Sequence, residues 1–308
     1  MISIERILCT ASLPPESDEA LRYAVLLARA YNAKLFLCHC AVAPVLATFP
    51  ITVAAHGQGK KLLTDTLARY MDRVGSRKLN WEIVVVENEK GAGEEIVREA
   101  CEQRVDLIVM RSRRSPVAAL LGSTAEQVSR TAFCPVLVAR PRGDEGDDEA
   151  EFQRVLVPHD FSSSSELALS YALSIAQKYR AELHLIHVLP EPQEDGPQIA
   201  WNETGVESAY HRAARRLQGS VPAEVYHWAR VLHVVRWGKP YREVLAYARE
   251  QDVDLICMGA LGRDFGLEAL FGSNVDRVLR QASCPVLIAR PLKLTTHASH
   301  ELHIHGAH

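Results

Sequence analysis

The chain has 308 residues, of which 47% are hydrophobic and 24% are charged, and its formal net charge is −3. This length and composition are typical of a globular protein with two domains, each able to bury its own core. No basic stripe follows any expected helix, so we expect no nucleic-acid partner. No stretch approaches the ~18–20 apolar residues that cross a bilayer, so we expect no membrane partner either.

The first apolar run and the cysteines indicate a cytoplasmic protein. Met1 leads into a short apolar run at residues 7–9, without the basic segment and long apolar core of a signal peptide. The seven cysteines lie mostly in apolar runs, which favours buried thiols over disulfides. Cys38-His39-Cys40 could form a metal or redox site. On a strand, however, the two cysteines would face one side and the histidine the other.

The sequence contains one internal repeat that spans both halves. Three blocks recur at an offset of 148: residues 6–10 with 154–158, 20–24 with 168–172, and 105–110 with 253–258. A fourth block, residues 134–141, recurs at 284–291 with an offset of 150. A two-residue slip must therefore lie between residues 110 and 122. Four blocks in the same order indicate a duplicated domain.

The composition between the blocks predicts the domain boundaries. Residues 1–141 form the first domain, 142–152 an acidic linker, and 153–291 the second domain. Residues 292–308 form a tail that holds five of the thirteen histidines. Such a tail could bind Zn²⁺ or Ni²⁺ adventitiously, but it defines no fixed ligand geometry.

Each half alternates β-branched runs with amphipathic segments. In the second half the expected strands are 154–157, 182–188, 231–235, 254–258 and 286–289, and the expected helices are 164–179, 206–218, 242–251 and 274–281. The strands are apolar nearly throughout, as expected where helices cover both faces of a parallel sheet. The sequence thus predicts two tandem, open, doubly wound α/β domains of five parallel strands. Ligands of such sheets bind beyond the carboxyl ends of the strands.

A glycine-rich loop follows the fourth strand of the second half. Gly259 and Gly262 permit sharp turns and close approach to a ligand, and nine residues later Gly272-Ser273-Asn274 opens the last helix. The N-terminus of that helix attracts anions, and the Ser273 hydroxyl could cap it or bind a phosphate. The alternative is that these glycines are only turn residues.

Other polar or chain-breaking residues are expected at the same edge of the sheet. Asp160 directly follows the first strand, Val188 ends the second, and Gly238-Lys239-Pro240 breaks the chain after the third. The carboxyl ends of parallel strands meet at one edge, so these residues favour a binding site over isolated turns.

With the terminal Cys-Pro-Val strand, this pattern of glycines and an early aspartate resembles the universal stress protein family, over residues 2–291. The chain is similar to the tandem members of that family, whose fold is Rossmann-like, of the adenine nucleotide alpha hydrolase type. The resemblance implies ATP as ligand, with Mg²⁺ as a candidate companion ion. It also implies that Asp160 contacts adenine or ribose and that the Val188 backbone reads the adenine edge.

By the same resemblance a set of residues lines the phosphates: Gly259, Gly262, Arg263, Gly272, Ser273 and Asn274. Arg263 is the weakest of these assignments, and Asn274 departs from the small apolar residue more usual there. Three neighbours complete the expected nucleotide-binding set: Pro158, His159 and Met258.

The first half departs from this pattern. Ser12 stands where the second half has Asp160, and Arg111 and Arg114 stand where it has Gly259 and Gly262. A bulky residue with positive φ costs roughly 1 kcal/mol or more, so the loop should have another shape. We expect the first half to have lost ATP binding. Arg111, Arg113 and Arg114 could form a different anion site, but solvated arginines are the simpler interpretation.

The leading functional hypothesis is a nucleotide-dependent stress-response protein without catalysis, because no Walker-type lysine or base for water is evident. A slow ATPase helped by Mg²⁺ is one alternative. Another is a scaffold in which the two halves form an intramolecular pseudo-dimer, with nucleotide incidental. By analogy with the family, strands 136–139 and 286–289 would face each other in that pseudo-dimer. A cysteine-based redox sensor ranks last. The sequence leaves open whether two chains pair further.

Overall fold

Apolar strands alternate with amphipathic helices along the chain, as the repeat predicts. The computed structural model describes residues 2–11, 18–41, 53–73, 79–87, 91–111, 122–140, 152–191, 203–261 and 272–291. The expected linker, the histidine-rich tail and the two-residue slip fall outside these residues, apart from position 152.

The first half contains five strands and four helices, in the order β1 (Arg6–Thr10), α1 (Asp18–Tyr31), β2 (Lys34–Ala41), α2 (Val53–Arg73), β3 (Trp81–Glu87), α3 (Ala92–Glu102), β4 (Leu107–Arg111), α4 (Ser123–Thr131) and β5 (Val136–Ala139). The second half repeats them as β6 (Arg154–Pro158), α5 (Ser163–Tyr179), β7 (Glu182–Leu189), α6 (Glu203–Gly219), β8 (Val231–Trp237), α7 (Pro240–Glu250), β9 (Leu255–Gly259), α8 (Ser273–Gln281) and β10 (Val286–Ala289). A 3₁₀ helix at Ala223–His227 was not predicted.

Helix α5 shows how local sequence sets these elements. The Ser162 side chain caps it by accepting a hydrogen bond from Ser165 N–H at 3.2 Å. The helix ends at Arg180, which adopts the left-handed conformation with φ of 55°. Its small and apolar residues at helical spacing, among them Ala168, Ala172 and Ile175, are buried against the sheet.

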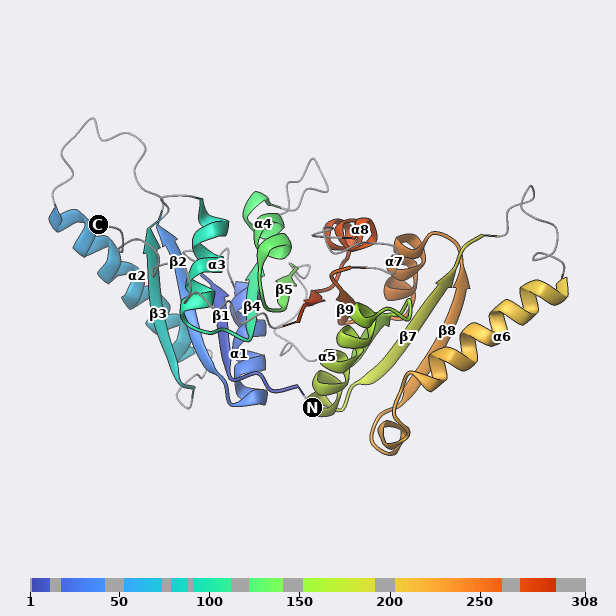
Figure 1. Ribbon diagram of the computed structural model, residues 1–308. Helices are drawn as coiled ribbons and strands as arrows, with labels where there is room; N and C mark the ends of the chain where they lie inside the picture. The colour runs from blue at the N-terminus through green and yellow to red at the C-terminus, as the bar shows by residue number, and fades with distance from the viewer. Residues whose placement is uncertain are drawn as a thin grey trace, which may run out of the picture.

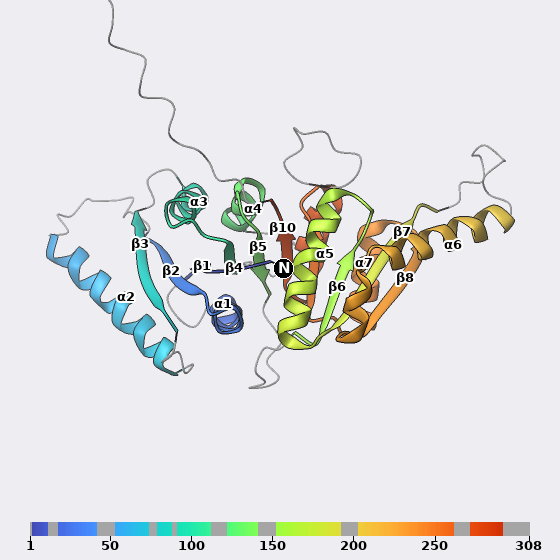
Figure 2. The same ribbon diagram turned by 60° about the horizontal axis from the view of Figure 1, so that its bottom comes forward.

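The two halves share one ten-stranded sheet in the order β3-β2-β1-β4-β5-β10-β9-β6-β7-β8 (Figures 1 and 2). Strands within each half are parallel, which confirms the predicted fold class. Between the halves, β5 and β10 pair antiparallel, with Leu137 opposite Leu287. The expected pairing of the two final strands is therefore confirmed.

Helices cover both faces of the sheet. Buried residues of α1, α2, α5 and α6 form one core, and those of α3, α4, α7 and α8 form the other. Figure 2 separates the two layers: α1, α2, α5 and α6 lie on one side of the strands. Coverage of both faces explains why the central strands are apolar throughout.

A repeated aspartate fixes the start of the first strand in each half. Asp106 Oδ2 accepts hydrogen bonds from the backbone N–H groups of Glu5 and Arg6, at 2.8 and 2.9 Å. Asp254 Oδ2 accepts the equivalent pair from residues 153 and 154, at 3.0 and 2.9 Å. These bonds explain why the Val-Asp-Leu block recurs.

On one face of the sheet the halves meet through α1 and α5. Tyr31 Oη donates to Ser174 Oγ at 2.9 Å, and Tyr179 Oη donates to the Leu26 carbonyl at 2.9 Å. Phe152 stacks on Tyr23 with ring centroids 5.6 Å apart and is 1% exposed. Buried aromatic pairs of this kind stabilise the contact beyond the area they bury.

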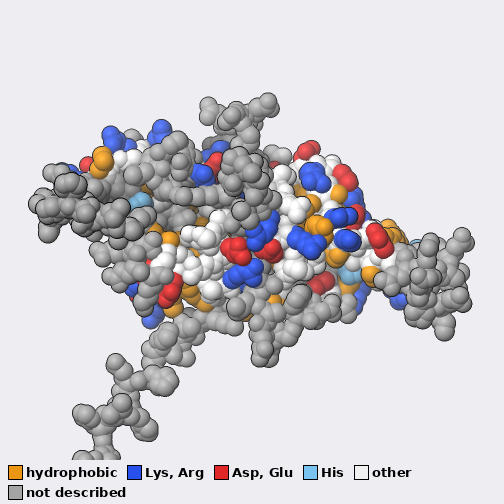
Figure 3. Space-filling model, turned by 90° about the horizontal axis from the view of Figure 1, so that it is seen from above, with side chains coloured by type: hydrophobic (Ala, Val, Ile, Leu, Met, Phe, Trp, Pro, Cys, Tyr) orange, Lys and Arg blue, Asp and Glu red, His pale blue; other side chains and the backbone are white. Residues whose placement is uncertain are grey.

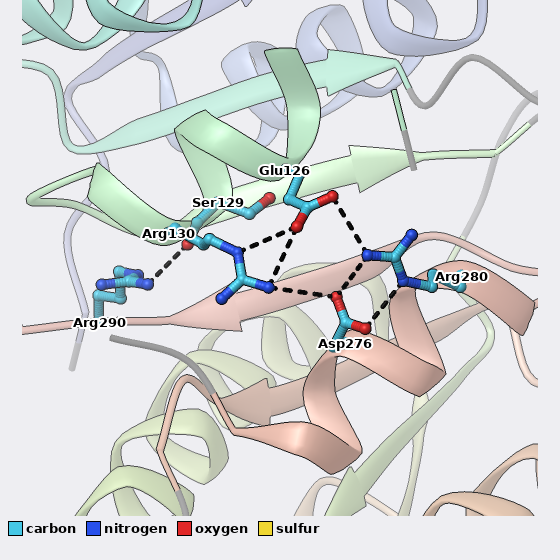
Figure 4. A network of polar contacts seen from close by, with 6 residues as sticks. All are labelled: Glu126, Ser129, Arg130, Asp276, Arg280 and Arg290. Atoms are coloured by element: carbon cyan, nitrogen blue, oxygen red, sulfur yellow. Dashed lines mark hydrogen bonds and ion pairs between the residues drawn. The ribbon is translucent and has the colours of Figure 1, made fainter. Parts of the chain in front are cut away.

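On the other face the halves meet through a symmetric ion network on α4 and α8 (Figure 4). Glu126 pairs with Arg130 at 3.1 Å, and Asp276 pairs with Arg280 at 2.8 Å, each within its own helix. Two further contacts cross between the halves: Arg280 to Glu126 at 3.1 Å, and Arg130 to Asp276 at 3.6 Å. Arg290 adds a hydrogen bond to the Ser129 carbonyl at 2.6 Å.

Candidate functional site

A pocket of about 730 Å³ lies at the carboxyl ends of the strands of the second half. Its walls come from the ends of β6, β7 and β9 and from the N-terminal turns of α7 and α8. Of the sequence-predicted residues, it brings together Pro158, His159, Asp160, Val188, Met258, Gly259, Gly272 and Asn274. This size is ordinary for a small-molecule site.

Asp160 is held by the turn that leads into α5. Its Oδ1 accepts hydrogen bonds from Ser162 N–H at 3.0 Å and from Ser162 Oγ at 2.6 Å. Between them Phe161 has a φ of 65°, the left-handed region that a bulky side chain rarely adopts. Local hydrogen bonds thus fix this carboxylate at the edge of the pocket, and the strained turn beside it is of a kind that clusters at functional sites.

Val188 lies beyond the ladder that joins β6 to β7. That ladder ends where Pro158 pairs with Ile186, whereas β7 continues to Leu189 alongside β8. Around Val188, β7 therefore pairs with β8 along one edge only, and this end of the strand lines the pocket.

His159 is a buried side chain, 3% exposed, next to this stretch. Its carbonyl accepts a hydrogen bond from His187 Nδ1 at 2.6 Å, and the first half repeats the contact between Ala11 and His39 at 2.8 Å. Burial lowers the pKa of His159, so the imidazole is neutral at pH 7. The repetition in both halves indicates that this backbone contact serves the fold.

Gly259 is required by packing. A Cβ at this position would lie 2.5 Å from the carbonyl carbon of Ser164 and 2.6 Å from its oxygen. Its φ is not positive, so no special turn needs it; the described glycines with positive φ are Gly91 and Gly238. The absent side chain lets the first turn of α5 lie directly on the end of β9. The sequence interpretation, a sharp turn and close approach to a ligand, missed this reason, and the positive φ expected at Gly259 and at its equivalent Arg111 is wrong.

Gly272 is the N-cap of α8, and no side chain caps this helix. The Gly272 N–H donates to the Ala260 carbonyl at 3.0 Å, which leaves phosphate binding to the later N–H groups of the first turn. Ser273 is the first helical residue and is exposed, so the alternative that it caps α8 is wrong. Asn274, half-buried, lines the pocket.

Several other sequence-predicted residues belong to the loops that follow the strands. Gly262, Arg263, Arg113, Arg114 and Ser12 lie outside the described residues. Arg111 ends β4 at the position equivalent to Gly259. It is half-buried, and its Nε has no hydrogen-bond partner among the described residues.

The structure also tests the geometry of Cys38-His39-Cys40. The two thiols share one face of β2: contact with Cys40 and burial raise the pKa of Cys38, and Cys40 Sγ donates to the Ala92 carbonyl at 3.8 Å. His39 turns to the other face, as expected. Across the described ranges, no three His, Cys, Asp or Glu side chains group as a metal site requires.

Sequence reasoning missed much of the apolar wall: Ile186, Leu189, Val244, Val275 and Val278. It also missed Tyr241, which lines the pocket one residue after the predicted break at Gly238-Lys239-Pro240. That break was the available signal, since residues after a strand end face the ligand site in such folds.

None of the helices within the described ranges is both long and apolar enough to span a bilayer.

Comparison with known proteins assigns the class. The model of the universal stress protein family matches residues 3–140 and again residues 151–290. The chain therefore belongs to the universal stress protein family and carries two copies of its domain.

Similar proteins match nearly the whole chain. The universal stress protein Rv2623 of Mycobacterium tuberculosis is 29% identical over 289 residues, covering 90% of this chain and 93% of its own. A crystal structure of a universal stress protein from Archaeoglobus fulgidus has a TM-score of 0.67 at 22% identity, covering 92% of this chain and 98% of that one. A crystal structure from Pseudomonas aeruginosa has a TM-score of 0.69 at 19% identity, covering 94% of this chain and 95% of that one. These two structures show the fold.

Proposed function

We propose that the second half binds an adenine nucleotide, ATP or a close relative, in this pocket. The bound nucleotide would set the conformation or partner choice of a stress-response protein. The observation that carries the proposal is the convergence of three elements on one cavity: the fixed carboxylate of Asp160, the backbone of β7 at Val188, and the uncapped N-terminus of α8.

Each element suits one part of a nucleotide. The carboxylate can accept hydrogen bonds from ribose hydroxyls or from the adenine amino group. Backbone groups at Val188 can pair with the edge of the base, and the apolar residues Met258 and Val244 line the same pocket. The dipole and N–H groups of α8 favour phosphate. A Mg²⁺ ion would be bound largely through the phosphates.

Binding without fast hydrolysis is the favoured activity. Asp160 is already engaged with Ser162, which suits a positioning contact better than activation of a water molecule.

We also infer a cytoplasmic location, which the seven free thiols support.

The first test is mass spectrometry of ligand released from freshly purified protein, joined to a melting curve with millimolar ATP. The proposal predicts a bound adenine nucleotide or a raised melting temperature, because a ligand that binds only the native state stabilises it. If neither result is obtained, the second candidate function, a pseudo-dimeric scaffold, is favoured instead. That candidate rests on the continuous sheet at β5 and β10 and on the α4–α8 ion network.

A further inference from the structure

A group of cations beside the pocket is not used by the nucleotide-binding elements above: Lys239 lines the pocket, and the exposed Arg242 and Arg277 meet on Tyr241, which also lines it. We propose that Lys239, the N-cap of α7, together with Arg242 and Arg277 on Tyr241, forms a second anion subsite. It takes a phosphate group of the nucleotide other than the one at α8, so the ligand is an adenine nucleotide with at least two phosphates. This inference rests on the proposed function, since it assigns the ligand class of the same pocket.

Tyr241 organises the cluster. It is half-buried, lines the pocket, and accepts a hydrogen bond from Arg242 Nε at 3.0 Å. The guanidinium carbon of Arg277, from α8, lies 4.5 Å from the centre of the same ring. Hydrogen bonds from Arg242 and then Arg277 lower the pKa of Tyr241. The two guanidinium groups are thus held on one ring at the pocket edge.

Within the described residues the cluster has no acidic partners. Neighbouring arginines are paired: Arg236 contacts Glu243 at 3.6 Å and also Glu250, and Arg280 contacts Asp276 and Glu126. By contrast, no carboxylate of the described chain pairs with any of the three cations of the cluster. Like charges gathered without counter-charges repel one another, and a bound anion relieves that repulsion. Figure 3, which looks down on this end of the sheet, shows several basic side chains, with acidic ones among them, on the half that holds the pocket.

Two helix N-termini add to the positive potential. Ser162 caps α5 with its side chain, but neither α7, with Lys239 as N-cap, nor α8, with Gly272 as N-cap, has a side-chain cap. Both of these N-cap residues line the pocket. The pocket therefore borders two helix N-termini without side-chain caps. At α7 the dipole and the cations supply most of the attraction for an anion, because Pro240 has no N–H and the N–H groups of Arg242 and Glu243 bond the Lys239 carbonyl.

The first half provides an internal comparison. The repeat offsets place four residues without positive charge at the positions of Lys239, Tyr241, Arg242 and Arg277; these are Gly91, Gly93, Glu94 and Gln127. A Cβ on Gly93 would lie 2.4 Å from Gln127 Oε1, so direct packing replaces the tyrosine–arginine contact there. Glu94 reverses the charge of Arg242. The cations and the aromatic ring thus occur together in the half that has the pocket and are replaced together in the other.

The test is calorimetric titration of the full chain with AMP, ADP, ATP and adenosine 3′,5′-bisphosphate. Wild type should bind at least one doubly phosphorylated nucleotide about tenfold more tightly than AMP, the gain expected from a charge-assisted contact. In Arg242→Gln/Arg277→Gln this advantage should fall below about threefold while AMP affinity stays unchanged. Arg249→Gln, an exposed position at the far end of α7, should keep the full advantage.

The outcomes separate this proposal from the one on which it rests. AMP binding to wild type supports the nucleotide site, whatever the ratio of its affinity to that of the other nucleotides. Equal affinity of wild type for AMP and for all three doubly or triply phosphorylated ligands overturns the second subsite. An unchanged ratio in the double variant, with wild-type circular dichroism, overturns it too. A gain with ADP alone puts the second phosphate on the 5′ chain, and a gain with the bisphosphate puts it on the ribose; both support the subsite.

Discussion

Gly259 is the position where the structure makes its sharpest stability prediction. In Gly259→Ala the new methyl carbon would meet three atoms of Ser164 at 2.5 to 2.6 Å, two of them backbone atoms. Ordinary carbon contacts lie near 3.5 Å, so the first turn of α5 must move by about 1 Å. Overpacking of this kind costs about 1–3 kcal/mol.

Urea unfolding of the full chain measures this cost, with Gly219→Ala as the matched control. Gly219 ends α6, and a Cβ there would meet nothing within 4 Å. The same substitution should therefore leave stability unchanged or raise it by up to about 1 kcal/mol. Because α5 begins beside Asp160, Gly259→Ala should also weaken nucleotide binding. A Gly259→Ala protein within about 0.5 kcal/mol of wild type would refute the packing argument.

Two further predictions concern the interface and the buried histidines. A double-mutant cycle with Glu126→Gln and Arg280→Gln should give a coupling of about 0.5–1 kcal/mol in unfolding free energy, because the pair joins the halves within a network. Burial lowers the pKa of His184, so the unfolded chain takes up protons first, and stability should fall as pH drops below about 6.5. His184→Gln should flatten that dependence, whereas His211→Gln, at an exposed position of α6, should not.

Each of these has a clear contrary result. No coupling at low salt would mean that the α4–α8 contacts do not hold the halves together. Stability that rises between pH 7 and pH 5, or an equal effect of the two histidine variants, would contradict the role of burial.

The sequence predicted the fold closely because its signals are local and repeated. Uninterrupted apolar strands indicate a sheet covered on both faces, whereas the β5–β10 pair was expected by analogy with the family. Most predicted elements of the second half lie within two residues of the observed ones.

What the sequence could not predict depends on packing between distant elements. Gly259 reads as a loop glycine, but the space it leaves is filled by Ser164, which is remote in sequence. Tyr241 and Arg277 are separated by more than thirty positions, so only the contact between α7 and α8 brings them together. The Gly272 N–H looked available for phosphate, yet it bonds the Ala260 carbonyl.

The central claim, one nucleotide site in the second half, is tested most directly by ATP titration of matched variants. Asn274→Asp puts a negative charge at the first turn of α8, where the helix dipole tolerates or favours it, so the fold should persist while phosphate is repelled. Thr124→Asp makes the equivalent change on α4. The account predicts one ATP per wild-type chain, about tenfold weaker binding in Asn274→Asp, and no change in Thr124→Asp. Two equal sites per chain, or loss of binding in Thr124→Asp alone, would contradict it.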